Sequence, residues 1–312
     1  MLNKIPIAAI TGGRGLVGVA ISIKLIKLGW DIKILSRCGS LSGSKLEKFK
    51  KHITIIESDI SDKKNLHNFV DGVDAIFHCA GEIYNNKKMY STNVEGTRDI
   101  LEASKKSKAS FFCYISSSGV VGPSSDVLVT EEIECHPQNT YEKTKYEAEI
   151  LVKNAVLDMS VCILRPTNVV SKDKIGVLSL AITNGWYDKV KVFLKGGEAT
   201  HLIHVEDVAN AAIYFMSNYL SGTHVYFVSI DENDGNTLSI MYNLCRSMCG
   251  YDNKVLYVMP LFVPYLLRTI FRGRCLYGNR VFSNKKIINS GFVFEYNMID
   301  IIEEICINTP PR

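Results

Sequence analysis

Short apolar runs of strand length recur along the first half of the chain, separated by stretches with apolar residues at helical spacing. We expect strands near residues 5–10, 31–36, 53–56, 74–78, 111–116 and 160–164. Strands that alternate with helices predict a parallel sheet with helices on both faces. The fold class indicated is therefore α/β, with a doubly wound parallel sheet.

The second half of the chain follows a less regular pattern, which begins after Arg165. Segments 166–200 and 229–312 predict a smaller cap over the carboxyl ends of the strands, where such sheets bind ligands. Residues 201–228 include a helical stretch that we expect to pack back on the domain formed by residues 1–165.

A glycine-rich turn, TGGRGLVG at 11–18, joins the first predicted strand to the first predicted helix. There Gly12 permits a tight turn, Gly15 lets the backbone approach a phosphate, and Gly18 lets the helix pack closely on the sheet. The helix N-terminus offers free N–H groups to an anion. The alternative is a plain turn, since glycine clusters commonly form one. The turn predicts a dinucleotide site that comprises Gly12, Arg14, Gly15, Leu16, Val17 and Gly18.

A second pattern, YEKTK at 141–145, lies in a stretch from Asn139 to Val156 with good helix formers and no Pro or Gly. The spacing places Tyr141 and Lys145 on one helical face. We expect the ammonium group to lower the pKa of the tyrosine and so to favour proton exchange. The alternative is an exposed helix with an ordinary Tyr and Lys. A dinucleotide turn followed by this pair favours hydride chemistry on a carbinol or ketone.

The order of the motifs resembles the extended short-chain dehydrogenase/reductases, the NAD-dependent epimerase/dehydratase family. The resemblance runs from about Ile5 to about Asn210 and weakens beyond. It implies a Rossmann-type sheet with a smaller C-terminal substrate-binding cap. After the glycine turn, the motifs that carry it are ESDI at 57–60, HCAG at 78–81, NVEGT at 93–97, SSSGVVG at 116–122, YEKTK at 141–145, LRPTN at 164–168 and HLIHVED at 201–207.

The resemblance also implies roles for individual residues. Ser117 stands five residues before Gly122, where the family places its catalytic Ser or Thr, and its neighbours in the serine run are rivals. Tyr141 would exchange a proton with the substrate, and Lys145 would hold the nicotinamide ribose. The alternative for the serines is a strand-end turn. The further cofactor contacts implied are Asp59, Ile60, Cys79, Ala80, Gly81, Asn93, Tyr141 and Lys145.

The end of the second predicted strand bears on the choice of cofactor. Ser36 stands where relatives that prefer NAD carry an acid for the ribose diol. Arg37, together with Arg14, suits a 2′-phosphate instead. We therefore expect NADP(H); the alternative is that Arg37 stacks on adenine and NAD(H) binds.

Candidate substrate residues follow from the same resemblance. Asn168 matches a position at which sugar-nucleotide epimerases contact the diphosphate, and Ser118 is expected beside the substrate. Thr200 replaces an arginine that those enzymes carry, so other cations must neutralise a diphosphate. Unless they are surface charges, the candidates are Arg272, Arg274 and Arg280.

We interpret the chain as an NAD(P)-dependent oxidoreductase or epimerase of a sugar nucleotide, with keto-sugar reduction slightly favoured. Dehydration is disfavoured because Ser118 and Gly119 stand where 4,6-dehydratases carry an Asp-Glu pair. The turn VVGP at 120–123 also resembles steroid- and flavonol-type reductases, so a hydrophobic ketone is the alternative substrate. A non-catalytic nucleotide sensor is a third interpretation, against which the intact Ser/Tyr/Lys set argues.

Composition is that of an ordinary globular protein, with 312 residues, 46% of them apolar and 22% charged. A net charge of +4 without a Lys/Arg cluster among aromatics gives no support to nucleic-acid binding. Nine cysteines without a CxxC pair fit reduced thiols in a cytoplasmic protein, and no metal site is expected. His201 and His204 are read as buried, hydrogen-bonded groups. We also expect a homodimer.

Neither the N-terminus nor the longest apolar stretch of the second half indicates a membrane role. The N-terminus enters the first predicted strand directly, which leaves no room for a signal peptide. The apolar stretch from Val255 to Phe271 is too short to span a bilayer and contains Pro260, Pro264 and Arg268. We interpret it as a wall of the substrate pocket, with a helix on the membrane surface as the less favoured alternative.

Overall fold

The computed structural model describes residues 4–183, 185–218, 220–233, 235–251, 255, 257–272 and 280–306, with the side chains of 271 and 272 left out. These residues form two compact units. The first runs to Val120 and includes Pro137–Arg165 and Val208–Tyr226. The second comprises Val121–His136, Pro166–Asp207 and the chain from Phe227 onward.

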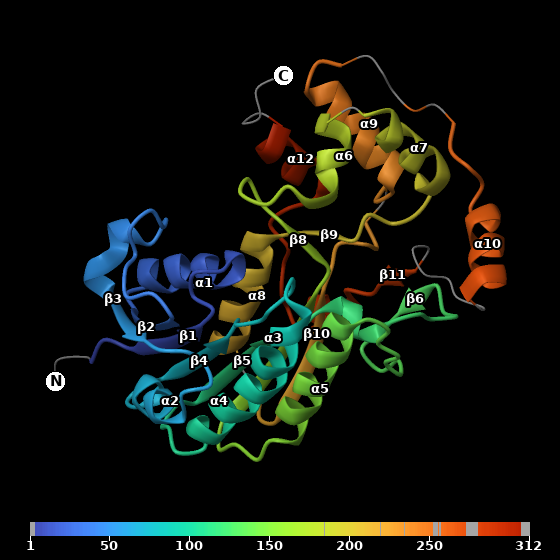
Figure 1. The fold of residues 1–312 in the computed structure, drawn as a ribbon. Coiled ribbons are helices and arrows are strands. Elements are labelled where there is room, and N and C mark those ends of the chain that lie inside the picture. Colours follow the sequence, from blue (N-terminus) through green and yellow to red (C-terminus); the bar gives the residue numbers. More distant parts are fainter. Residues whose placement is uncertain are drawn as a thin grey trace. The chain divides into compact units, whose positions relative to one another are not determined.

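A seven-stranded parallel sheet forms the centre of the first unit, in the order β3-β2-β1-β4-β5-β7-β10 (Figure 1). The six strands predicted from the sequence are all present, and the Rossmann-type α/β class is confirmed. The strand that the hydrophobic pattern did not reveal is β10, at the edge beside β7. The strands are β1 (Ile7–Thr11), β2 (Asp31–Ser36), β3 (Ile53–Glu57), β4 (Ala75–His78), β5 (Phe111–Ile115), β7 (Ser160–Pro166) and β10 (Thr223–Val228).

Helices cover the sheet on both faces, which explains why the central strands are largely apolar; all residues of β4, β5 and β7 are buried. Helices α2, α4 and α5 pack in a row on one face, and α1 and α8 lie on the other (Figure 1). The helices that accompany the sheet are α1 (Leu16–Lys27), α2 (Lys63–Val70), α3 (Asn86–Met89), α4 (Gly96–Ser104), α5 (Thr140–Asn154) and α8 (Val205–Ser217), with short η1 (Glu47–His52), η2 (Tyr90–Glu95) and η3 (Ser118–Val121).

The start of α5 is fixed by a capping box. The Asn139 side chain accepts a hydrogen bond from the Glu142 backbone N–H at 2.9 Å, and the Glu142 carboxylate accepts one from the Asn139 N–H at 3.4 Å. Reciprocal caps of this kind satisfy amide groups that a helix N-terminus leaves open. The cap therefore sets the position of Tyr141, in the first turn of the helix.

The second unit is built from short strands and helices, in keeping with the irregular pattern of its sequence. Strands β6 and β11 pair with each other, as do β8 and β9. Within the described residues, no helix has both the length and the apolar run needed to cross a bilayer. The elements are β6 (Leu128–Val129), β8 (Asn168–Val170), η4 (Gly176–Leu178), α6 (Ser179–Thr183), α7 (Trp186–Lys195), β9 (Leu202–His204), α9 (Leu238–Met248), α10 (Phe262–Arg272), β11 (Val281–Phe282), α11 (Lys285–Asn289) and α12 (Met298–Cys306).

Candidate active site

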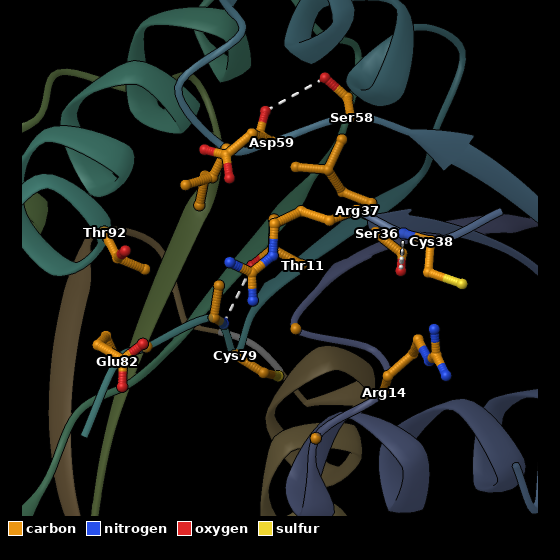
Figure 2. Close-up of a pocket in the computed structure, with 16 residues that line it drawn as sticks. Thr11, Arg14, Ser36, Arg37, Cys38, Ser58, Asp59, Cys79, Glu82 and Thr92 are labelled. Atoms are coloured by element: carbon orange, nitrogen blue, oxygen red, sulfur yellow. Dashed lines mark hydrogen bonds between the residues drawn. The ribbon is translucent and has the colours of Figure 1, made fainter. Parts of the chain in front are cut away.

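An open cleft of about 530 Å³ lies in the first unit, where strands β1 to β4 end (Figure 2). The predicted cofactor residues that line it are Gly12, Arg14, Gly15, Arg37, Asp59, Ile60, Cys79, Ala80 and Gly81. The lining residues that sequence reasoning did not assign to the cofactor are Thr11, Leu35, Ser36, Cys38, Ser58, Glu82 and Thr92. Most of these follow the carboxyl end of a strand, and that position was the signal that could have revealed them.

The glycine turn has the close packing that its sequence predicts. Gly12 adopts a φ of 64°, and a Cβ there would lie 2.7 Å from the Ala80 backbone nitrogen. A Cβ on Gly18 would collide with the Gly12 carbonyl oxygen, so α1 lies directly against the turn. Gly15 is the N-cap residue of α1, and Leu16 and Val17 form its first turn. The Gly15 N–H donates to the Gly12 carbonyl at 2.8 Å, so the N–H groups suited to an anion are those of the first turn of α1.

A buried chain of hydrogen bonds ties the glycine turn to the end of β4. His78 Nδ1 lies 2.6 Å from the Thr11 hydroxyl, and His78 Nε2 lies 2.8 Å from the Thr97 hydroxyl. Thr97 in turn donates to the Asn93 carbonyl oxygen at 2.5 Å. Burial lowers the pKa of His78 to about 3, so the ring stays neutral and can accept from one threonine while it donates to the other. The Ala80 N–H also donates to the Thr11 hydroxyl at 3.2 Å, which fixes one wall of the cleft.

Asn93 does not line the cleft; it is buried, and its side chain holds the segment that does. Its Oδ1 accepts from the Glu82 N–H at 2.7 Å, and its Nδ2 donates to the Glu82 carbonyl at 3.1 Å and to the Thr144 hydroxyl at 3.0 Å. Thr144 lies on α5, so Asn93 links the cleft wall to the helix that carries Tyr141 and Lys145. A direct cofactor contact for Asn93 stays a prediction.

Two arginines mark the end of the cleft next to β2. Figure 2 shows Arg14, Ser36 and Cys38 on one side and Glu82 and Thr92 on the other, with the Arg37 side chain reaching toward the middle. The serine hydroxyl accepts a hydrogen bond from the Cys38 N–H at 3.2 Å. This arrangement places two guanidinium groups and a hydroxyl together at the end of β2.

Opposite these groups, the Asp59 carboxylate accepts hydrogen bonds from the Ser61 N–H at 3.1 Å and from its hydroxyl at 2.9 Å. These bonds lower the pKa of Asp59 and keep it ionised. An ionised carboxylate can accept hydrogen bonds, as the predicted cofactor contact of Asp59 requires.

The predicted catalytic residues lie together in the first unit. The Ser117 side chain is close enough to the Tyr141 phenol to lower its pKa, and the Ser117 hydroxyl accepts the Gly119 N–H at 3.1 Å. Lys145 is buried; its Nζ donates to the Ile115 carbonyl oxygen at 2.6 Å and lies 4.2 Å from the centre of the Tyr114 ring. The geometry therefore favours Ser117 among the three serines as the partner of the tyrosine.

The expected effect of Lys145 on Tyr141 is wrong for the protein without cofactor. Burial raises the pKa of Tyr141, and the Ser117 side chain opposes that rise, whereas Lys145 is not among the groups that lower it. The reason is that Lys145 reaches back to the end of β5, where burial lowers its own pKa to about 7. At neutral pH, Lys145 is therefore protonated only part of the time, and its amino group is held at the Ile115 carbonyl. It thus stabilises the phenolate of Tyr141 little.

Behind the catalytic residues lies a buried ion pair that the sequence did not reveal. Glu149 and Arg165 are 0% and 1% exposed, and two hydrogen bonds join them, at 3.0 Å from Nε and 2.6 Å from Nη2. The same carboxylate accepts the Ser116 hydroxyl at 2.7 Å and pairs with Lys153 at 2.8 Å. The pair therefore ties α5 to the ends of β5 and β7, and it commits Ser116 to a structural role.

The predicted substrate residues fall in both units, and two of them lie wholly or partly outside the described residues. Ser118 is buried at the start of η3, in the first unit, whereas Asn168 is exposed on β8, in the second, and donates to the Thr200 carbonyl at 3.3 Å. Arg280 is buried in the second unit, where it donates to the Gly122 carbonyl and its guanidinium lies 4.9 Å from the Phe282 ring centre. Arg274 and the side chain of Arg272 lie outside the described residues. Their roles toward a substrate stay predictions.

His201 and His204 are both hydrogen-bonded or paired, as the sequence predicted, but only His204 is buried as expected, whereas His201 is half-buried. His201 Nδ1 lies 2.5 Å from the Asp231 carboxylate. The other, His204, is buried, stacks on Tyr296 with ring centres 3.9 Å apart and pairs with Glu304 at 3.2 Å.

A glycine turn before a helix N-terminus, a cleft at the carboxyl edge of a parallel sheet and a Ser/Tyr/Lys group together define a dinucleotide-binding oxidoreductase fold. The family model described as "NAD dependent epimerase/dehydratase family" matches residues 8–229. The chain belongs to this family, and it is an enzyme of the extended short-chain dehydrogenase/reductase type.

Relatives of several activities are similar to the chain. It is 26% identical over 268 residues to a putative UDP-glucose 4-epimerase of Methanocaldococcus jannaschii, covering 80% of this chain and 85% of that protein. It is also 26% identical to a 3-beta-hydroxysteroid dehydrogenase of Mycolicibacterium neoaurum, covering 77% and 69%. An uncharacterised protein of Sinorhizobium fredii is 27% identical, but the chain spans only 52% of its length.

Solved structures share the fold at low sequence identity. The Bordetella bronchiseptica enzyme WbmG in complex with NAD has a TM-score of 0.76 at 17% identity, over 97% of this chain and 93% of that one. The UDP-glucose 4-epimerase of Thermotoga maritima, solved with UDP-glucose, has a TM-score of 0.71 at 20% identity, over 97% of both chains.

Proposed function

We propose that this protein transfers hydride between NADP(H) and a carbinol or ketone of a sugar nucleotide, with reduction of a keto-sugar as the favoured reaction. The observation that carries the proposal is the proximity of the Ser117 side chain to the Tyr141 phenol, with Lys145 one helical turn further along α5. A hydroxyl that can donate to a carbonyl and a phenol that can release a proton are what this reaction requires.

The residues of the cleft fit a dinucleotide. The glycines of the turn carry no side chains, and added Cβ atoms would strike the backbone. A pyrophosphate can therefore approach the main chain closely, and the N-terminus of α1 offers N–H groups to it. Gly12, Gly15 and the first residues of α1 would hold the pyrophosphate, and Asp59 would bind the adenine. When bound, the nicotinamide would supply or accept the hydride.

The side chains of the protein would manage the proton and the developing charge. Ser117 would donate a hydrogen bond to the substrate oxygen, and Tyr141 would protonate the alkoxide that forms during reduction. Because burial raises the pKa of Tyr141, the phenol stays protonated at neutral pH, as an acid catalyst must. Groups placed where charge develops stabilise the transition state more than the ground state.

The preference for NADP(H) rests on the end of β2. Removing the Arg37 guanidinium should weaken NADPH binding by roughly 1.5–3 kcal/mol, the scale of a charged hydrogen bond, and leave NADH binding nearly unchanged. Fluorescence titration of Arg37→Ala with both cofactors measures this difference. Lys63→Ala, which removes an exposed charge from α2, serves as the control and should change neither affinity. Equal losses for both cofactors would assign Arg37 to adenine stacking or structure and would favour NAD(H).

The substrate class is supported by the sugar-nucleotide enzymes among the relatives. With cofactor present, at least one of UDP, dTDP and GDP should bind in a calorimeter. Arg272→Ala or Arg274→Ala should weaken that binding tenfold or more, about 1.4 kcal/mol, because Thr200 is neutral. Arg98→Ala, on the exposed face of α4, is the control.

Two further outcomes would redirect the proposal. Mass spectrometry of any nucleotide released from the purified protein distinguishes the reactions, since retained NAD would indicate epimerisation and an empty site reduction. If no nucleoside diphosphate binds while an apolar ketone is reduced, the substrate is a hydrophobic ketone, as the similarity to a hydroxysteroid dehydrogenase allows.

A further inference from the structure

A cluster of three thiols lies in the second unit, within a part of the chain to which the proposed reaction assigns no role. Cys245 and Cys249 stand four residues apart at the carboxyl end of α9, and Cys306 belongs to α12. Their sulfur atoms all lie within 4.8 Å of one another, and those of Cys245 and Cys306 are 3.0 Å apart. Cys245 and Cys306 are buried, and Cys249 is partly exposed.

A buried cation without a matching anion lies next to these thiols. Arg246 is fully buried; its Nη1 donates to the Ala181 carbonyl at 3.3 Å, and its guanidinium lies 3.8 Å from the Tyr251 ring centre. Among the described residues, its Nε and Nη2 have no hydrogen-bond partner, and no carboxylate pairs with it. Burial of a charge without a partner costs free energy, and a negative charge nearby would offset that cost.

We propose that Cys245, Cys249 and Cys306 bind a zinc ion as thiolates. Three thiolates and one Zn²⁺ carry a net charge of −1, and Arg246 balances it. A monovalent soft ion would leave the site with an excess negative charge. The partly exposed side of Cys249 leaves room for a water molecule as the fourth ligand, so that the tetrahedral coordination typical of zinc is complete.

Geometry and electrostatics both suit a cation here. With Zn–S distances of about 2.3 Å, the sulfur atoms of a tetrahedral site stand about 3.8 Å apart, so binding requires Cys245 and Cys306 to separate slightly by side-chain rotation. The carboxyl end of α9 presents partial negative charge, which favours a positive ion.

Binding must displace protons from the three thiols. Cysteine thiols are ordinarily protonated at neutral pH, and zinc binds them as thiolates. Three protons leave as the ion enters, and the apparent affinity for zinc should rise with pH.

The test uses the full chain, reduced and stripped of metal with a chelator, and titrates it with Zn²⁺ alone against a chromogenic chelator. We expect one zinc per chain and protection of three thiols from alkylation. Cys249→Ser should weaken binding at least tenfold, and Cys306→Ser should do the same. Co²⁺ should give thiolate charge-transfer absorption that Cys249→Ser diminishes.

Two controls separate this site from other thiols. Cys38→Ser removes an exposed thiol, and Cys162→Ala removes one of a buried pair whose partner is Cys113 on the neighbouring strand. Neither should change zinc binding. If Cys306→Ser does not fold, Cys249→Ser decides, because its side chain is only partly buried and thermal unfolding of the metal-free form checks its fold.

The proposal is overturned if zinc does not bind stoichiometrically, or if Cys249→Ser leaves the affinity unchanged. It is also overturned if, in aerated buffer, dioxygen oxidises Cys245 and Cys306 to a disulfide in preference to zinc binding. That outcome appears as a loss of two thiols that a reductant restores. None of these measurements depends on the hydride-transfer activity, so the two proposals can fail independently.

Discussion

Replacing Tyr141 with phenylalanine should lower turnover by at least about a hundredfold, the scale of general acid–base catalysis by one side chain. The change removes the proton that the phenol would give to the alkoxide and the interaction of the phenol with the Ser117 side chain. The ring and its packing remain. Affinity for the cofactor should change little, because the cleft that we assign to it is lined by other residues.

Steady-state kinetics and cofactor titration of the same preparation measure these two effects separately. Tyr90→Phe is a matched control, since the Tyr90 hydroxyl also contacts α5, where it donates to Glu147 at 3.0 Å on the exposed surface. It should keep normal turnover. Near-normal turnover of Tyr141→Phe would refute the assignment of the proton donor and leave the fold assignment intact.

Glu149→Ala should lower the free energy of unfolding by about 3–5 kcal/mol at neutral pH, the usual result of removing one partner of a buried ion pair. The substitution removes the carboxylate that accepts two hydrogen bonds from the Arg165 guanidinium. It also removes the acceptor of the Ser116 hydroxyl and so loosens the end of β5 beside the catalytic residues. Chemical denaturation measures the loss.

The effect should depend on pH in a defined direction. The charges of Arg165 and Lys153 outweigh burial and lower the pKa of Glu149 in the folded protein. Its stabilising contribution is therefore complete above the unfolded pKa of about 4.3 and is lost as the pH falls through the lower folded value. The difference between wild type and Glu149→Ala should shrink toward strongly acidic pH.

Glu102→Ala is the control for this prediction. Glu102 pairs with Lys105 at 2.6 Å, but the two side chains are 61% and 41% exposed. An exposed pair of this kind contributes at most about 1 kcal/mol, because water screens it. A loss as small for Glu149→Ala as for Glu102→Ala would show that the buried pair does not stabilise the fold.

Local patterns in the sequence determined most of the first unit. Six of the seven strands follow from apolar runs, because a parallel strand covered on both faces must be apolar along its whole length. The glycine turn is equally local, since a positive φ at Gly12 and the contact of α1 with the turn both exclude side chains. The helical spacing of Tyr141 and Lys145 placed both on α5.

Only the tertiary structure decided how distant groups meet. The sequence could not separate Ser116 from Ser117, because the choice depends on Glu149 and Tyr141, which lie far along the chain. Nor could it show that Lys145 reaches the Ile115 carbonyl and so does not lower the pKa of Tyr141, which burial raises.

The thiol cluster of the second unit also depends on the tertiary structure. In the sequence, Cys245 and Cys306 stand 61 residues apart and follow no metal-binding spacing, yet their sulfur atoms lie 3.0 Å apart in the fold. Hydrophobic periodicity and residue spacing indicate only which side chains lie on each face of a single segment. Burial, charge pairing and contact between distant side chains depend on which segments pack together, and packing is a property of the whole chain.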